Sequence, residues 1–109
     1  MNLNTQMKKG VLELIVLLSV NKQDMYGYQL IEAVSKVVDV NDGTIYPLLK
    51  RLTNERYFDT YLVESTEGPP RKYYKLTILG KEKMNELLEI WSTFATSVNN
   101  FIKECETHE

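Results

Sequence analysis

A short segment near the middle of the chain, Asn41-Asp42-Gly43-Thr44-Ile45-Tyr46-Pro47-Leu48-Leu49-Lys50-Arg51-Leu52, determines how the rest is organised. Its apolar residues recur three and four positions apart, as they do on one face of an α-helix. The opposite face is polar and could be pressed against a phosphate-lined groove. An ordinary amphipathic surface helix is the alternative. The polar face comprises Tyr46, Pro47, Lys50 and Asn54, with Thr44 and Arg51 on its flanks.

Two features of this segment indicate where its helix begins. Asn41 or Asp42 can cap the helix by accepting a hydrogen bond from a free amide of the first turn. Pro47 has no N–H and is tolerated only near the start of a helix. We therefore expect the helix to begin a few residues before Pro47.

Length and composition indicate one globular domain. The chain has 109 residues, of which 43% are hydrophobic and 26% charged, which suits a modest single core. No apolar run is long enough to span a bilayer, and the N-terminus lacks the pattern of a signal peptide. The single cysteine, Cys105, can form no internal disulfide, so we expect a cytoplasmic protein.

The distribution of charge matters more than its sum. The formal net charge is −2, yet residues 1–76 hold ten Lys/Arg against nine Asp/Glu, and residues 77–109 hold three against six. Residues 68–81 contain four basic residues and no acidic one. Because a small basic patch is enough to contact a few phosphates, the overall acidity does not exclude nucleic acid as a partner.

Two further helices are expected before the central segment. The first extends from about Leu3 to Val20 and is apolar almost all round, which indicates burial on more than one side. In so short a chain, we expect one of those sides to meet another subunit. The second extends roughly from Tyr26 to Val38. The second helix and the central helix are joined by a short turn, and the central helix is basic on its outer face. Two helices in this arrangement form a helix-turn-helix pattern.

A β-hairpin is expected after the central helix. Residues 57–63 are rich in aromatic and β-branched side chains, residues 64–70 have the composition of a turn, and residues 71–76 resume as a strand. The second strand carries Arg71, Lys72 and Lys75. A basic hairpin directly after a helix-turn-helix predicts a wing.

The last helix is predicted to extend from Thr77 or Ile78 to about Glu104, with an apolar seven-residue repeat. Such a repeat requires a partner helix, and at about 1.5 Å per residue this helix would be longer than a compact domain is wide. We therefore expect a mainly α protein with a small β-hairpin, organised as a winged helix-turn-helix (residues 1–76) and a C-terminal dimerisation helix (residues 77–109) that packs on the first helix of the partner. The expected interface comprises Leu14, Met84, Leu87, Trp91, Phe94, Val98 and Phe101.

Candidate DNA contacts follow from this arrangement. The basic side chains of the helix and the wing would contact phosphates, which supply affinity without sequence information. Thr44 and Tyr46 would meet base edges in the major groove, whereas Lys50 could instead bond guanine and Asn54 adenine. Tyr26 and Tyr28 are either core residues or phosphate contacts. The phosphate contacts we expect are Lys50, Arg51, Arg71, Lys72 and Lys75.

The sequence is similar to the PadR family of bacterial transcriptional regulators, and the resemblance covers nearly the whole chain. It implies a winged-helix homodimer that represses transcription at a pseudo-palindromic operator, with half-sites about 34 Å apart, and that releases DNA when a small aromatic or drug-like molecule binds. The short C-terminal helix resembles that of the small subfamily. The matching motifs are Val11-Leu12-Glu13-Leu14-Ile15-Val16-Leu17-Leu18, Tyr26-Gly27-Tyr28-Gln29-Leu30, Gly43-Thr44-Ile45-Tyr46-Pro47 with Leu49-Lys50-Arg51-Leu52, and Arg71-Lys72-Tyr73-Tyr74-Lys75-Leu76-Thr77 with Gly80.

Trp91 resembles the tryptophan of the multidrug-responsive branch of this family, where the two subunits sandwich flat ligands between their tryptophans. The resemblance implies that Trp91 is a ligand platform and Leu88 a pocket wall. Ala95 stands where the drug binder has an acidic residue, which argues against a preference for cationic drugs. The alternative is that Trp91 only fills the dimer interface.

Enzymatic and metal-binding functions are not expected. The single histidine, His108, lies at the C-terminus, so no Ser-His or Cys-His pair can be built on a rigid scaffold. One histidine and one cysteine give no metal-ligand spacing, and no cofactor is implied. The remaining alternative is a winged helix that binds a protein instead of DNA, which a pI near 5.5 favours.

Overall fold

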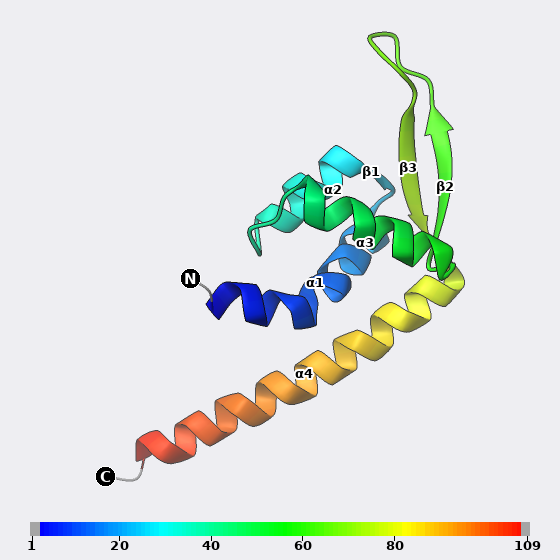
Figure 1. The fold of residues 1–109 in the computed structure, drawn as a ribbon. Helices are drawn as coiled ribbons and strands as arrows, with labels where there is room; N and C mark the ends of the chain where they lie inside the picture. The colour runs from blue at the N-terminus through cyan, green and yellow to red at the C-terminus, as the bar shows by residue number, and fades with distance from the viewer. Residues whose placement is uncertain (1–2, 108–109) are drawn as a thin grey trace.

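The computed structural model describes residues 3–107, with side chains described for residues 11–106. It is mainly helical with a small antiparallel sheet, arranged as a winged helix-turn-helix with a long C-terminal helix (Figure 1). The expected fold class is thereby confirmed. In chain order the elements are α1 (Leu3–Lys22), β1 (Met25–Tyr26), α2 (Gly27–Ser35), α3 (Asp42–Asn54), β2 (Phe58–Val63), β3 (Arg71–Leu76) and α4 (Ile78–Thr107).

The core lies between the first helices and the base of the sheet. The inner face of α3 is fully covered at Ile45, Leu49 and Leu52, as its spacing predicts. Burying one such side chain contributes about 1.5–3 kcal/mol, so this cluster fixes how α3 lies on its neighbours. The fully buried side chains are Val16, Leu17, Leu30, Val34, Ile45, Leu49, Leu52 and Phe58.

The start of α3 follows the capping chemistry of its sequence. The Asn41 side chain accepts a hydrogen bond from the Thr44 N–H at 3.2 Å, and the helix begins at Asp42. Pro47 lies inside the helix. The carbonyl that would otherwise have bonded its missing N–H belongs to Gly43, which is exposed and can bond water instead.

The sheet has the strand order β1-β3-β2 and is antiparallel throughout. The second strand of the hairpin spans Arg71–Leu76, the range predicted from the sequence. The first strand, β1, was not expected. Tyr26 belongs to this strand, because it pairs with Tyr73, and not to the second helix. That helix also ends at Ser35 rather than at Val38.

The base of α4 is fixed against the turn between α3 and β2. The Thr77 hydroxyl donates to the Arg56 carbonyl at 2.7 Å and accepts from the Gly80 N–H at 2.9 Å, so it caps the helix. Gly80 packs so tightly on the Tyr57 carbonyl that a Cβ atom would overlap the Tyr57 oxygen. The glycine therefore permits the close approach of the two segments.

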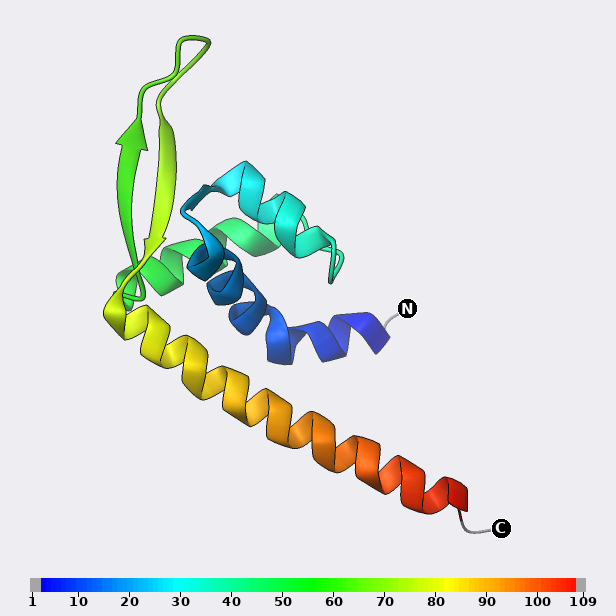
Figure 2. The ribbon, with the colours of Figure 1, turned by 180° about the vertical axis from the view of Figure 1, so that it is seen from behind.

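The rest of α4 leaves the domain. Its C-terminal half extends beyond the other helices in both views (Figures 1 and 2). The extents are 64 × 32 × 20 Å and the radius of gyration is 16.8 Å, against about 13 Å for a compact chain of this length. Among the described residues, no helix is long and apolar enough to cross a membrane.

Candidate nucleic-acid interface

The outer face of α3 is open to solvent. Tyr46, Lys50 and Asn54 are spaced four residues apart, which places them on one side of the helix, and all three are exposed. Within residues 11–106, neither the Lys50 nor the Asn54 side chain makes a hydrogen bond or an ion pair. These side chains are therefore available to an external partner.

Thr44 occupies the first turn of α3 and serves its own cap. Both its N–H and its hydroxyl point to the Asn41 side-chain oxygen, at 3.2 and 3.4 Å. The residue is exposed, and its hydroxyl can still accept a hydrogen bond. A base edge could be met by that hydroxyl or by the methyl group beside it.

Tyr46 reaches across to the start of α2. A Cβ atom built at Gly27 would lie 2.5 Å from the Tyr46 ring, so the absence of a side chain at Gly27 is what lets the ring lie there. Gly27 thus makes room for a side chain of α3 at the start of α2. A hollow of about 370 Å³ opens at this point, lined by Tyr26, Gly27, Tyr28, Tyr46, Arg71, Lys72 and Tyr74.

Aromatic rings hold the wing, the hairpin of β2 and β3, against β1. Tyr73 stacks on Tyr61 with 5.6 Å between ring centroids and meets Tyr26 edge-on at 5.3 Å. The Tyr61 hydroxyl donates to Asp24 at 2.6 Å, and this bond raises the pKa of Tyr61. The Arg71 guanidinium lies 4.7 Å from the Tyr26 ring centroid. These contacts fix the orientation of the paired strands of the wing relative to β1, with Arg71 beside Tyr26.

The basic residues of β3 divide into two groups. Arg71 and Lys72 share the hollow that Tyr46 lines. Lys75 is at the base of the wing, opposite Asp59 in the strand register, and lines a different hollow together with Lys81. The structure therefore brings Arg71 and Lys72 together with α3, but not Lys75.

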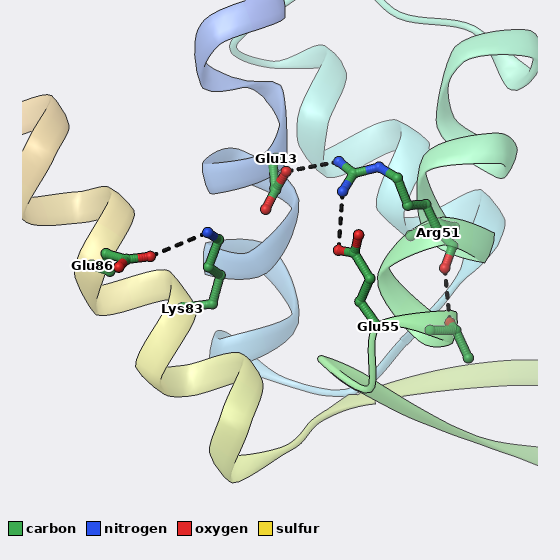
Figure 3. A network of polar contacts seen from close by, with 7 residues as sticks. Glu13, Arg51, Glu55, Lys83 and Glu86 are labelled. Carbon is green, nitrogen blue, oxygen red and sulfur yellow. Dashed lines mark hydrogen bonds and ion pairs between the residues drawn. The ribbon is translucent and has the colours of Figure 1, made fainter.

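Arg51 has partners within the chain. Its guanidinium donates to Glu13 of α1 at 2.7 Å and to Glu55 at 3.0 Å (Figure 3). The hydrogen bond with Glu13 is the main reason that the pKa of Arg51 lies above its ordinary value. Glu13 was not identified from sequence as a site residue. The four-residue spacing of Arg51 and Glu55 was visible in the sequence, but the Glu13 contact joins distant segments.

The residues expected at the dimer interface fall into two groups, one buried within the protomer and one exposed on α4. Leu14 and Met84 are buried within the protomer, and Leu87 packs against the same core. The distal side chains of α4 stand in solvent, with exposures of 60% for Phe94 and 64% for Phe101. Large exposed apolar patches mark interaction sites in soluble proteins. The exposed stripe comprises Leu88, Trp91, Phe94, Val98, Phe101 and Ile102.

Among the described residues, no group of three or more His, Cys, Asp or Glu side chains could hold a metal ion. Asp24 receives the Tyr61 hydroxyl and Asp42 opens α3, which are structural roles.

These features define a winged helix-turn-helix protein with an exposed polar face on its third helix, a basic hairpin beside that face, and a projecting apolar helix. Residues 16–86 match the model of the transcriptional regulator PadR-like family. The chain belongs to this family, so it is a DNA-binding transcriptional regulator and not an enzyme.

Solved structures of similar proteins agree with the assignment. A PadR-like transcriptional regulator from Bacillus cereus is 39% identical, with a TM-score of 0.81 over 89% of this chain and 96% of that one. A PadR-like transcription factor from Bacteroides fragilis is 40% identical, with a TM-score of 0.75 over 93% and 99%. A transcriptional regulator from Streptococcus is 33% identical, with a TM-score of 0.78 over 88% and 96%.

Proposed function

We propose that the chain acts as a homodimeric repressor that places α3 of each subunit in the major groove of a pseudo-palindromic operator. The observation that carries this proposal is the position of Arg71 and Lys72 beside Tyr46, at the edge of the exposed face of α3. A helix of about 10–12 Å diameter fits the major groove of about 12 Å. The neighbouring cations would then meet the phosphates that border that groove.

Each polar residue of this surface has a proposed role. Lys50, Arg71 and Lys72 contact phosphates, and Lys75, at the base of the wing, makes a peripheral contact. Thr44 and Tyr46 meet base edges near the N-terminal end of α3. Asn54 suits adenine because its amide NH2 can donate to N7 while its amide oxygen accepts from the N6 amino group. Arg51 is left out of this set because two carboxylates already surround its guanidinium.

The dimer is proposed to form through the exposed stripe of α4. Covering this stripe removes apolar surface from water, which stabilises association. A second copy is the partner best suited to a seven-residue apolar repeat, since the same seam occurs on both chains. Such a dimer would hold its two α3 helices about one turn of DNA apart, roughly 34 Å.

An effector site is proposed around Trp91, with Leu88 as its wall. Trp91 is 45% exposed and lies 6.3 Å from Phe94 between ring centroids, so two subunits could offer facing aromatic surfaces to a flat ligand. Trp91 is the single tryptophan of the chain. Quenching of its emission by planar aromatic compounds would therefore report binding at this site, and a compound panel without any quenching would leave Trp91 as an interface residue only.

Salt dependence tests the DNA-binding surface directly. Binding of the wild-type protein to DNA from its own promoter region is measured between about 50 and 200 mM salt. Six to eight phosphate contacts per dimer predict a slope of log K against log [salt] between about −5 and −7. Lack of any slope would instead favour the winged helix as a protein-binding module, the alternative suggested by a net charge of −2.

A further inference from the structure

Glu13 lies among charged side chains from two other helices. It accepts a hydrogen bond from Arg51 of α3 at 2.7 Å, and Lys83 of α4 is near enough for the Glu13 carboxylate to contribute to the raised pKa of Lys83. Lys83 itself bonds Glu86 at 3.1 Å, and that bond is the main cause of its shift. Figure 3 shows the three helices converging on this cluster.

The cluster is separate from the face of α3 proposed to meet DNA. Successive helical residues advance by about 100°, so Arg51 lies a quarter-turn or more from Lys50, on the side that faces α1. Its two terminal nitrogens bond different carboxylates, Glu13 and Glu55. The guanidinium fork is therefore oriented toward these two carboxylates, although the Arg51 side chain remains 49% exposed.

The Arg51–Glu13 contact spans two helices whose backbones are not in close contact. The backbone of α3 lies along α2 and β2 over more residues than along α1, and the long arginine side chain reaches across to Glu13. The Glu13 side chain is 23% exposed and is thus the more covered partner. Partial removal from water strengthens an ion pair relative to one at a fully exposed site.

We infer that Arg51 is a positioning residue, which through Glu13 sets the orientation of α3 relative to the α1 and α4 pair. This inference rests on the proposed function, because α4, against which α1 packs, is the helix through which the two subunits would join. In a dimer, the two α3 helices must match two half-sites at once. Because the subunits are identical, a tilt of α3 relative to the rest of its subunit occurs in both and moves both α3 helices away from their half-sites. The Arg51–Glu13 ion pair resists that tilt.

The experiment compares Arg51→Gln, Glu13→Gln and the double variant by operator affinity over a range of salt concentrations. Lys50→Gln, which removes a proposed phosphate contact, provides the reference for a changed slope. Glu89→Gln removes an exposed carboxylate of α4 at a position outside the apolar seam, and controls for the change in net charge. Each variant is first confirmed to be dimeric by sedimentation.

A positioning role predicts that Arg51→Gln and Glu13→Gln each weaken operator binding about three- to tenfold, in the range that a lost partner in an ion-pair network produces. The salt slope should stay at the wild-type value, and the double variant should be no weaker than either single variant. Exchange of the two charges, Glu13→Arg with Arg51→Glu, should recover part of the affinity. Glu89→Gln should not weaken binding.

A phosphate-contacting Arg51 would give the opposite pattern and overturn the inference. Arg51→Gln would then reduce the magnitude of the slope by about 1.8, because two phosphate contacts would be lost per dimer. Glu13→Gln would free the guanidinium and tighten binding. If the wild type shows no salt-dependent DNA binding, the proposed function fails and this inference with it; a changed slope in Arg51→Gln alone contradicts only the inference.

Discussion

The outer face of α3 and the distal stripe of α4 are both exposed, but they suit opposite kinds of partner. The face of α3 presents a phenol, an amide and an ammonium group, and it is rimmed by the basic residues of β3. The stripe of α4 presents two phenylalanines and a tryptophan. Polar and cationic groups retain hydrogen bonds against a hydrated polyanion, whereas exposed aromatic rings gain from a dry contact. The two regions thus suit a hydrated contact with DNA and a dry contact with the proposed second copy.

The two regions are also supported differently. The face of α3 rests on a fully buried underside, so its side chains start from a rigid base. The stripe begins where α4 leaves the core, beyond Met84 and Leu87. A dimer would therefore order the part of α4 that has the fewest neighbours within its own chain.

Substitution of Phe94 by aspartate should have the largest effect. A carboxylate buried without a partner costs several kcal/mol, so we expect the dimer dissociation constant to rise at least about hundredfold. Sedimentation measures the change. Thr96→Asp places the same charge on the exposed side of α4 and should leave the dimer intact. A dimer of normal affinity in Phe94→Asp would exclude the stripe from the interface.

Gly80→Ala tests how firmly α4 is joined to the winged domain. The added Cβ would overlap the Tyr57 carbonyl, which is backbone and cannot turn aside. We expect a loss of about 3 kcal/mol in the free energy of unfolding, measured by chemical denaturation. In Gly43→Ala the new methyl group meets only the Asn41 side chain, at 3.3 Å. That variant should be at least as stable as the wild type, because alanine favours a helix.

Lys50→Ala tests the outer face of α3 and leaves the exposed stripe of α4 unchanged. We expect about tenfold weaker operator binding and a salt slope smaller in magnitude by about 1.8, with the circular dichroism spectrum and the dimer unchanged. Lys103→Ala removes an exposed cation from α4 and serves as the matched control. Equal effects of the two substitutions would mean that general charge, and not the face of α3, accounts for binding.

The smallest effect is expected at Arg56, which has a φ of 68° in the left-handed region. It follows α3 at the position that glycine prefers, and the Tyr57 N–H closes the turn onto the Leu52 carbonyl at 3.0 Å. Arg56→Gly should raise the free energy of unfolding by about 0.5–1 kcal/mol. Lys36→Gly, at a φ of −68°, should lower it. A less stable Arg56→Gly protein would show that the arginine side chain makes a contact that outweighs the strain.

Local patterns of sequence predicted most of this fold. The helix cap expected at Asn41 or Asp42, the hairpin strand Arg71–Leu76 and the start of the last helix at Thr77 or Ile78 all depend on residues close in the chain. The structure has the cap at Asn41, the strand as expected and the helix from Ile78. The strand β1 could not be predicted, because Met25 and Tyr26 become a strand only by pairing with residues nearly fifty positions away. The burial of Leu14 and Met84 could be predicted only in part. Their helical spacing shows that they are buried, but not whether their own chain or a partner chain covers them, and the structure buries them within the protomer.

The candidate site was also predictable in part, because local spacing can be recognised in the sequence and long-range contacts cannot. The four-residue spacing of Tyr46, Lys50 and Asn54 identifies a shared face of α3, and the structure leaves all three exposed. Arg51 lies on the flank of that face, and the sequence alone cannot distinguish a cation that faces a phosphate from one that faces a carboxylate. Its bond to Glu13 joins residues 38 positions apart in the chain, which no local pattern encodes.

Hydroxyl-radical footprinting of the wild-type protein on its own promoter DNA tests the central claim most directly. A dimer joined through α4 that inserts one α3 per subunit predicts two protected segments on one face of the duplex, centred about 34 Å apart. Phe94→Asp should lose both segments together. A single protected segment, or two segments that persist in Phe94→Asp, would contradict the account.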